Sequence, residues 1–315
     1  MKREKKLIQK ICDVQNLHEA YYKAARHKRN SLEYLVFSEG VERKLEEIRL
    51  ELLSVNYKPG LYRQFKISDP KERMISAAPF KDRLIHHAII NILEPVFERQ
   101  LIFHTYACRK GKGTHASARY AFEMTKSAKC FLKLDVRKYF DSVDHRILKN
   151  HLCRIIKDGQ CLELLFSVIE SYCTADGFGL PIGNLTSQFF ANLYLSPLDH
   201  FILEKHKPKG YVRYMDDMVV FSDSMETLSK TFSSIEIFCR EKLHLNLKPP
   251  IFGLSKQGLP FLGWLVKSNG VYLLSRTKRR MKEKIRSIEK DFCAGQSERK
   301  FLSRMESVLA SRKLL

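Results

Sequence analysis

Residues 211–222 read YVRYMDDMVVFS, and this stretch decides the fold. Apolar runs flank the pair Asp216-Asp217, and this pattern predicts a β-hairpin with the two aspartates in its turn. A second apolar run, at residues 131–136, predicts a strand that carries Asp135 near its end. If these strands are neighbours in one sheet, three carboxylates meet at one edge of that sheet.

Carboxylates that converge need a cation among them. Without one they repel each other, and some take up protons. Oxygen ligands of this kind suit Mg²⁺, which keeps several waters and binds substrate phosphates. Two such ions, for which Mn²⁺ is a substitute, can stabilise the attacking and leaving oxygens of a phosphoryl transfer. An Asp-Asp pair by itself is more typical of a plain turn, because aspartate favours turns. The interpretation therefore depends on the flanking residues.

The composition indicates a folded protein with a polyanionic partner. Lys and Arg number 56 against 35 Asp and Glu, a formal net charge of +21, and 44% of the residues are hydrophobic. This surplus disfavours compactness unless a polyanion relieves the repulsion, and nucleic acid is the natural candidate. A basic protein that is merely very soluble is the alternative. No G-x-x-x-x-G-K-[ST] motif occurs, which argues against a P-loop ATPase.

The cysteines and the apolar runs predict a cytoplasmic protein. Eight cysteines form no C-x-x-C pair, which favours reduced core thiols over a zinc site or a disulfide framework. The N-terminus lacks an apolar run long enough for a signal peptide. Nowhere do 18 uncharged apolar residues follow one another, so we expect no membrane span.

The periodicity of the whole chain predicts the α+β class. Residues 1–60 read as helical and basic, and residues 61–78 as a short hairpin with Asp69-Pro70 as its turn. Apolar residues at helical spacing predict helices at about 81–99, 137–151, 160–172, 186–195 and 227–243. A last helix is expected from Met281.

The flanking motifs resemble those of reverse transcriptases. Residues 214–217, YMDD, are similar to the aromatic-x-Asp-Asp box of that family, and LKLDVRKYFDSVDH at 132–145 is similar to its first palm motif. Further similar segments follow in the family's order: KERMISAAPFKDR at 71–83, FHTYACRKGKGTH at 103–115, GLPIGNLTSQFFANLYL at 179–195, LHLNLKPP at 243–250 and GLPFLGW at 258–264. Ordered agreement of this kind is far more specific than a single box.

The resemblance implies a right-hand polymerase with palm, fingers and a small helical thumb. Residues 1–60 would be a basic helical extension, and 61–130 the fingers with the start of the palm. The palm would cover 131–265, with a fingers-side helix at about 160–195, and the thumb 266–315. We expect no RNase H, endonuclease or DNA-binding domain in this chain.

The resemblance also assigns the catalytic acids. Asp135 and Asp216 match the family's metal ligands, and Asp217 matches the supporting acid of the box, also near the metal. The backbone carbonyl of Val136 is expected as a further ligand. Asp144 is expected to be an ordinary acid beside a helix, hydrogen-bonded or solvated.

Other matching positions are expected to bind the nucleotide. Lys71 and Arg73 would hold the triphosphate, since a guanidinium grips phosphate well. Phe140 would be a steric gate against the 2′-hydroxyl, with an ordinary core position as the alternative. Lys248 would be a general acid near the leaving pyrophosphate. Gly183 would let the backbone approach the nucleotide closely.

Basic and hydrophobic positions are expected at the template and primer. The loop residues Arg109, Lys110 and Lys112 suit template phosphates. The basic residues of the last helix would follow the duplex backbone, although a solvated helix face would look similar. Arg83 is interpreted as a structural ion-pair partner. The primer grip would consist of Leu262, Gly263 and Trp264.

One segment narrows the resemblance. Residues 182–188, IGNLTSQ, are similar to reverse transcriptases of diversity-generating retroelements, whereas group II intron and retron enzymes usually carry Gln-Gly there. This similarity implies mutagenic retrohoming, in which a primer is extended with dNTPs along a template-repeat RNA. The cDNA that results carries errors opposite adenine. It also implies a bacterial or phage origin and a small basic accessory protein that forms a pentamer. Ile182 cannot form the hydrogen bonds of glutamine, so we hypothesise that it lowers fidelity.

Three alternatives stay open at this point. The chain could be another bacterial reverse transcriptase, such as a group II-like, retron or antiphage-defence enzyme. It could be a nucleotide cyclase on a similar palm, although the fingers and primer-grip motifs argue against that. It could also be a catalytically inactive RNA-binding protein, against which the three intact aspartates argue.

Overall fold

The computed structural model describes residues 4–68 and 72–310 and divides into two compact units, each built from three segments of chain. The first unit comprises Met1–Phe103, Val136–Phe201 and Ile235–Leu247. The second comprises His104–Asp135, Ile202–Ser234 and Lys248–Leu315. Helices and strands mix in the chain as predicted, so the α+β class is confirmed.

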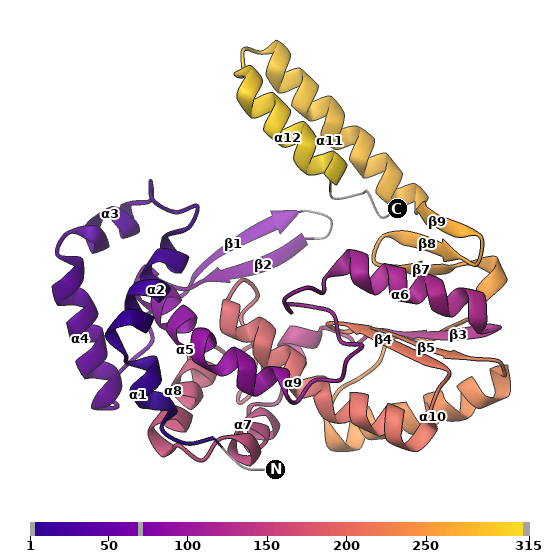
Figure 1. Cartoon of the computed structure of the whole chain (residues 1–315), viewed down its shortest axis with the longest axis horizontal. Helices are drawn as coiled ribbons and strands as arrows, with labels where there is room; N and C mark the ends of the chain where they lie inside the picture. The colour runs from indigo at the N-terminus through magenta and orange to yellow at the C-terminus, as the bar shows by residue number, and fades with distance from the viewer. Residues whose placement is uncertain (1–3, 69–71, 311–315) are drawn as a thin grey trace. The chain divides into compact units, whose positions relative to one another are not determined.

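A four-stranded antiparallel sheet forms the centre of the second unit (Figure 1). Its strands lie in the order β4 (Gly210–Tyr214), β5 (Asp217–Ser222), β3 (Cys130–Leu134) and β6 (Ile251–Leu254). The apolar runs of β3 and β5 lack strict alternation because both faces of the sheet are covered. Helix α6 (Thr114–Ser127) covers one face, and residues 225–234 of α10 (Met225–Lys242) lie on the other (Figure 1).

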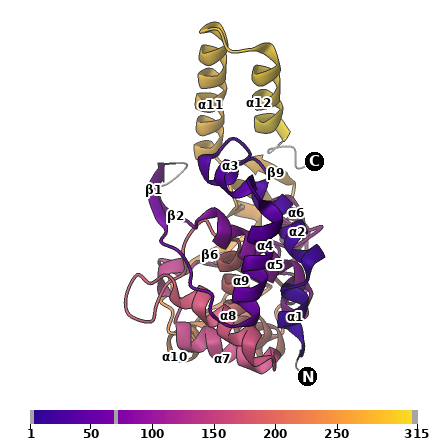
Figure 2. The ribbon, with the colours of Figure 1, turned by 90° about the vertical axis from the view of Figure 1, so that its left-hand side faces the viewer.

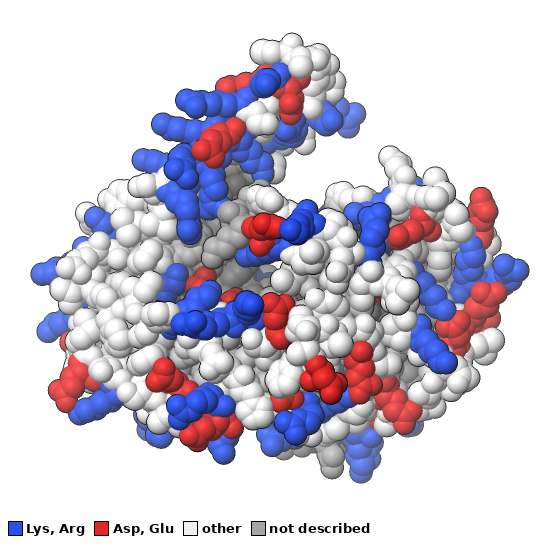
Figure 3. All heavy atoms as spheres, turned by 180° about the vertical axis from the view of Figure 1, so that it is seen from behind, with Lys and Arg blue, Asp and Glu red and all other residues white. Residues whose placement is uncertain are grey.

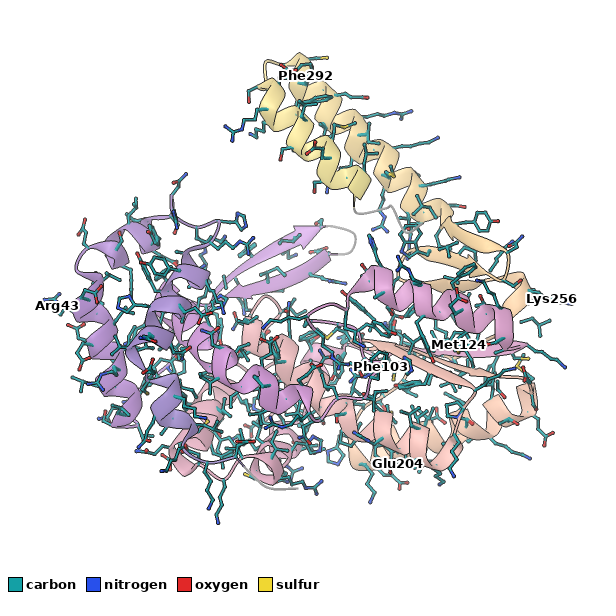
Figure 4. All side chains as sticks on the ribbon, viewed as in Figure 1. Arg43, Phe103, Met124, Glu204, Lys256 and Phe292 are labelled. Atoms are coloured by element: carbon teal, nitrogen blue, oxygen red, sulfur yellow. The ribbon has the colours of Figure 1, made fainter. Side chains whose placement is uncertain are left out.

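Helix α6 packs very closely on the sheet. A Cβ atom at Gly210 would lie 2.3 Å from the Sδ atom of Met124, the α6 residue labelled in Figure 4. The other face of α6 contacts a three-stranded antiparallel sheet of β7 (Leu259–Phe261), β8 (Trp264–Lys267) and β9 (Gly270–Leu273). The hydrophobic core of this unit therefore runs from one sheet through α6 to the other.

The second unit ends in two antiparallel helices, α11 (Ser275–Cys293) and α12 (Glu298–Ala310), which lie side by side in Figure 2. The rings of Phe292 and Phe301 pack with centroids 4.5 Å apart, and Arg304 bonds Asp291 at 2.7 Å. Lys and Arg side chains gather along this pair (Figure 3). The prediction of a last helix from Met281 was wrong at its start and missed α12, because dense Lys and Arg hide the apolar spacing.

The first unit is largely helical around a buried α5 (Phe80–Glu98). Helix α5 packs against α2 and α9, and the hairpin of β1 and β2 confirms the strands predicted at residues 61–78. The turn Asp69-Pro70 and Lys71 lie outside the described residues. The other elements of this unit are α1 (Leu7–Ile11), α2 (Val14–Ala25), α3 (Leu32–Ser38), α4 (Val41–Leu53), β1 (Arg63–Ser68), β2 (Glu72–Ala77), α7 (His145–Ile155), α8 (Gly159–Glu170) and α9 (Leu185–Phe201).

The helix predicted at residues 137–151 is divided in two. A short 3₁₀ turn, Tyr139–Ser142, comes first, and α7 begins only at His145. Asp144 caps α7, because its Oδ1 accepts from the backbone N–H groups of Arg146 and Ile147. Its side chain is buried and also bonds His244, so the expected hydrogen bonding is confirmed and solvation is wrong.

The cysteines are free, but only some are core residues. Cys12, Cys130, Cys161 and Cys239 are buried, which confirms the prediction for these four. The prediction of a core position is wrong for Cys173 and Cys293, which are exposed, and Cys108 and Cys153 are half-buried. Adjacent apolar residues in the sequence do not show which face of a helix a thiol occupies. Over the described part of the chain, no helix has the length and apolarity to cross a bilayer.

Candidate active site

The turn between β4 and β5 has an unusual backbone. Tyr214 pairs with Asp217, so Met215 and Asp216 form a two-residue turn. Met215 has a φ of 53°, a left-handed conformation that residues with a side chain seldom adopt. Positive φ at the first central position matches a type II′ turn, whose twist suits a hairpin.

A buried arginine supports this turn. Arg213 is fully buried, and its Nη1 donates to the backbone carbonyl of Met215 at 3.1 Å. Its own backbone is held on the far side of β4, where its N–H donates to His104 at 3.0 Å and its carbonyl accepts from Tyr106 at 2.9 Å. The Arg213 side chain therefore fixes the conformation of the turn, and backbone hydrogen bonds to His104 and Tyr106 fix the strand that leads into it.

The three predicted acids come together at this turn. Strand β3 pairs with β5 so that Leu134 lies opposite Met218, which brings Asp135, the next residue, level with Asp217. Burial and, next, the negative charge of Asp135 raise the pKa of Asp216 to about 7. The structure thus places the three carboxylates in one electrostatic cluster, while their catalytic roles stay a prediction.

Two lysines neutralise the cluster. The Nζ of Lys248 lies 2.6 Å from Oδ2 of Asp135, and its backbone N–H donates to the carbonyl of the same residue at 2.8 Å. The Nζ of Lys133 lies 3.2 Å from Oδ1 of Asp217. Sequence reasoning placed Lys248 near the pyrophosphate but missed Lys133 and Arg213. The signal for Lys133 was present, because a lone lysine interrupts the apolar strand 131–136.

The donor atoms suit a hard divalent cation. Oδ1 of Asp135 is buried and accepts no hydrogen bond from the described residues, and buried oxygens normally have a partner. Oδ1 of Asp217 is buried as well, and the Lys133 ammonium at 3.2 Å is its ion-pair partner. Carboxylate oxygens are the ligands that Mg²⁺ prefers. In the described ranges no three His, Cys, Asp or Glu side chains already have the spacing of a metal cage. A cation bound here would therefore have to displace the Lys248 ammonium and draw the carboxylates together.

The predicted nucleotide residues that the structure describes outside this cluster belong to the first unit. Arg73 is exposed on β2, opposite Ile67. Phe140 is half-buried in the 3₁₀ turn, and its carbonyl accepts from Leu180 at 2.8 Å. Val136 is buried and pairs with Leu247 in an isolated bridge. Arg83 pairs with Glu33 at 3.1 Å, which confirms its interpretation as an ion-pair partner.

The loop that carries Ile182 and Gly183 docks on β2. The carbonyl of Ile182 accepts from the N–H of Ser76 at 2.9 Å. Gly183 has a φ of 115°, and a Cβ there would lie 2.8 Å from Cγ2 of Ile75. Only glycine fits this position, because it must adopt that φ and lie close to the strand.

The predicted template loop precedes α6. Arg109 donates from Nη1 to the carbonyl of Thr105 at 2.6 Å, and Nζ of Lys112 lies 4.9 Å from the ring centroid of Tyr106. Lys110 is exposed in the same loop. These contacts stiffen the loop, and the binding of template phosphates by its cationic groups stays a prediction.

The predicted primer grip is the turn between β7 and β8. Phe261 pairs with Trp264, and the two central residues, Leu262 and Gly263, have φ of 48° and 89°. Positive φ at both positions is typical of a type I′ turn. The Trp264 side chain is 4% exposed and packs against His115, so it supports the turn from within the core. Of the three residues predicted for the primer grip, Trp264 is buried and Leu262 and Gly263 are half-buried.

Comparisons with known proteins agree with the motifs. Residues 64–264 match the family described as "Reverse transcriptase (RNA-dependent DNA polymerase)". Protein YkfC of Escherichia coli is 28% identical over 178 residues, which cover 52% of this chain and 46% of that protein. Group II intron-encoded protein LtrA of Lactococcus lactis is 26% identical over 172 residues, which cover 52% of this chain and 29% of that protein. The chain therefore spans less than half the length of these relatives.

Solved structures of telomerase have a similar fold. Apo telomerase from Candida tropicalis matches with a TM-score of 0.55 at 11% identity, over 80% of this chain and 57% of that one. Telomerase from Candida albicans with a fragment of telomeric RNA matches with a TM-score of 0.52 at 13% identity, over 81% and 55%. These likenesses confirm the predicted right-hand polymerase fold. With a family match that runs from the β1–β2 hairpin to the β7–β8 turn, the chain belongs to the reverse transcriptases.

Proposed function

We propose that this chain is an RNA-directed DNA polymerase in which Asp135, Asp216 and Asp217 are the catalytic acids. The observation that carries this proposal is the meeting of these carboxylates at the β4–β5 turn, where the buried Oδ1 of Asp135 has no hydrogen-bond partner among the described residues. Two Mg²⁺ ions bound there would activate the primer 3′-hydroxyl and stabilise the charge on the transferred phosphoryl group. The backbone carbonyl of Val136, the residue after Asp135, is proposed as a further ligand.

The lysine beside Asp135 would change partners during nucleotide addition. Lys248 holds Asp135 at 2.6 Å in the protein alone. When the Asp135 carboxylate binds a metal ion, the Lys248 ammonium is free to turn to the leaving pyrophosphate and to donate a proton to it. Arg73 would bind the incoming triphosphate, and Phe140 would exclude a 2′-hydroxyl. Arg109 and the Leu262-Gly263 turn would hold template and primer.

Primer extension tests this proposal. We expect purified protein to incorporate dNTPs on a primed RNA in the presence of Mg²⁺, and Asp135→Asn to lose at least about 1,000-fold in rate, since one charged ligand is removed. Asp223→Asn is a matched control, because Asp223 pairs with Lys209 beyond the far end of β5. Wild-type protein without metal-dependent incorporation would refute the proposal and favour an RNA-binding protein that does not copy.

We further propose that the template is a repeat RNA copied with errors opposite adenine, as part of a diversity-generating retroelement. The support is the sequence IGNLTSQ at residues 182–188 and the apolar side chain at Ile182. Hydrogen bonds discriminate substrates better than apolar contacts. A small basic pentameric accessory protein and action in the cytoplasm of a bacterium belong to this proposal.

The error spectrum tests this finer assignment. Ile182→Gln is expected to reduce misincorporation opposite adenine several-fold, while Ile182→Val keeps the apolar character and the errors. An unchanged spectrum in the glutamine variant contradicts the role of Ile182.

A group II-like reverse transcriptase is the second candidate, favoured by the similarity to LtrA. Wild-type enzyme with uniformly low errors at all four template bases would support it instead.

A further inference from the structure

A pocket lies on the first unit between α7 and the C-terminal part of α10. Its volume is about 320 Å³, near the small end of the roughly 300–1,000 Å³ of ligand sites. Helix α7 presents one whole face to it, with residues at spacings of three and four. The lining residues that matter below are Ile147, Asn150, His151 and Arg154 from α7, and Phe238 and Lys242 from α10.

Hydrogen bonds hold the two helices that form the pocket. The Nδ1 of His244, two residues after α10, lies 2.9 Å from Oδ2 of Asp144, the N-cap of α7. The hydroxyl of Tyr194 on α9 donates to the carbonyl of Leu243 at 2.6 Å. Because these ties are made in the protein alone, the pocket is formed before any ligand arrives.

Two polar groups in the pocket have unused hydrogen-bonding capacity. Nδ1 of His151 is buried and has no hydrogen-bond partner among the described residues. Burial, and then the charge of Arg154, lower the pKa of His151 to about 4, so this imidazole is neutral at pH 7. The exposed amide of Asn150 lies one residue away. A neutral imidazole and an amide can each donate and accept a hydrogen bond.

An aromatic ring and two cations complete the lining. The ring of Phe238 stacks on Phe201 at 4.4 Å and 28°, which fixes its orientation. Arg154 and Lys242 are exposed, and neither forms an ion pair within residues 4–68 and 72–310. The pocket therefore combines an apolar surface, a neutral polar edge and unneutralised positive charge.

We propose that this pocket binds one unpaired nucleotide of an RNA strand. Phe238 would contact the face of the base, Asn150 and His151 its edge, and Arg154 and Lys242 the flanking phosphates. Unpaired bases are recognised in this way, by stacking together with hydrogen bonds to their edges. An acidic peptide would satisfy the cations but has no planar base to lie against the ring of Phe238. The pocket contains none of the residues assigned to nucleotide addition, so this inference goes beyond the proposed function.

Photo-crosslinking can locate the nucleotide. Full-length protein in EDTA, which suppresses metal-dependent dNTP binding, is irradiated with 8-azido-AMP and digested. We expect the label on peptides that contain residues 147–154 or 238–243, and competition by AMP at least tenfold stronger than by inorganic phosphate. His151→Leu and Arg154→Glu should each reduce labelling at least fivefold. Lys157→Glu, an exposed charge change just after α7, is the matched control.

Three outcomes would overturn the inference: a label on other peptides, equal labelling of the pocket variants and the wild type, or phosphate or an acidic peptide competing as well as AMP. Arg154 is exposed in the last turn of α7, so its variant should keep the fold with at most a small loss of stability, and a thermal melt checks this. Primer extension is measured in parallel. Wild-type protein that takes the label in the pocket but does not extend a primer contradicts the proposed polymerase alone. Wild-type protein that extends a primer but takes no label in the pocket contradicts this inference alone.

Discussion

Two hairpin turns of the second unit solve the same backbone problem in different ways. The β4–β5 turn places Met215 at positive φ, and the β7–β8 turn places Leu262 and Gly263 there. In the second turn, glycine takes one of the two left-handed positions without steric cost. In the first turn no glycine is present, and the buried Arg213 holds the strained residue through its carbonyl. The β4–β5 turn, which carries acidic side chains, is thus stabilised by a buried arginine outside the turn. The β7–β8 turn is stabilised by the glycine that it contains.

Removal of the support beneath the acidic turn should have the largest effect. We expect Arg213→Met to lower the rate of primer extension about 100-fold and to destabilise the protein by about 1–3 kcal/mol, because the Met215 carbonyl loses a buried donor. Arg213→Lys keeps the charge and tests the geometry of the guanidinium. Single-turnover rates and urea titrations give both numbers. Full activity in Arg213→Met would mean that the turn keeps its shape unaided.

Of the two turns, only the acidic β4–β5 turn should respond to a change of pH. The raised pKa of Asp216, about 7, means that the metal-free protein holds a proton there below that pH. Mg²⁺ must displace this proton, so affinity should fall about tenfold for each pH unit below 7 and level off above it. The same raised pKa means that metal-free stability declines as pH rises from about 4 through 7.

Calorimetry in buffers of different ionisation enthalpy measures the proton released when the metal binds. Binding without proton release at pH 6 would show that Asp216 is ionised already, contrary to the expectation. The β7–β8 turn contains no titratable side chain and gives the control: Leu262→Ala should leave the pH profile unchanged.

Replacement of Gly263 in the β7–β8 turn should lower the stability of the protein. Gly263→Ala places a Cβ at a φ of 89°, and we expect a loss of about 1–2 kcal/mol in the free energy of unfolding. Because the turn is also the proposed primer grip, KM for the primed template should rise while Mg²⁺ affinity stays constant. A thermal melt and a template titration separate the two effects. Unchanged stability would mean that the turn relaxes to another type.

A glycine in the acidic turn should have the smallest effect on stability. Met215→Gly removes the left-handed strain but adds freedom to the unfolded chain, two terms of about 1 kcal/mol that oppose each other. We expect the melting temperature to change little and the extension rate to fall a few-fold, because the turn becomes less rigid. A faster enzyme would show that the strain hinders catalysis.

The sequence predicted what depends on local pattern. The acidic hairpin was readable because two apolar runs flank Asp216-Asp217, and the strand of Asp135 because its apolar run is compact. The meeting of the three carboxylates at one edge followed from the assumption that the two strands are neighbours, and the register of β3 with β5 confirms this assumption. The motif order then identified the polymerase fold without any three-dimensional information.

Side-chain contacts between distant segments outside these motifs were not predictable. Arg213 looks like any strand residue until its full burial is known, and the His244–Asp144 bond joins residues 100 positions apart. Trp264 was predicted as part of the primer grip, and the burial of its indole in the core was not readable from the motif. Burial of a polar or aromatic side chain depends on which elements pack over it, and local periodicity carries no record of that packing.

The interleaving of the two units constrains the order in which the chain can fold during synthesis. The first unit needs residues up to Leu247 and the second begins at His104, so neither is complete when the first 200 residues have left the ribosome. Strand β3 must wait for its neighbour β6, more than 100 residues later. Contacts of such long sequence separation slow folding. The nascent chain therefore exposes the apolar run of β3 for many seconds of translation, which makes it a natural substrate for chaperones.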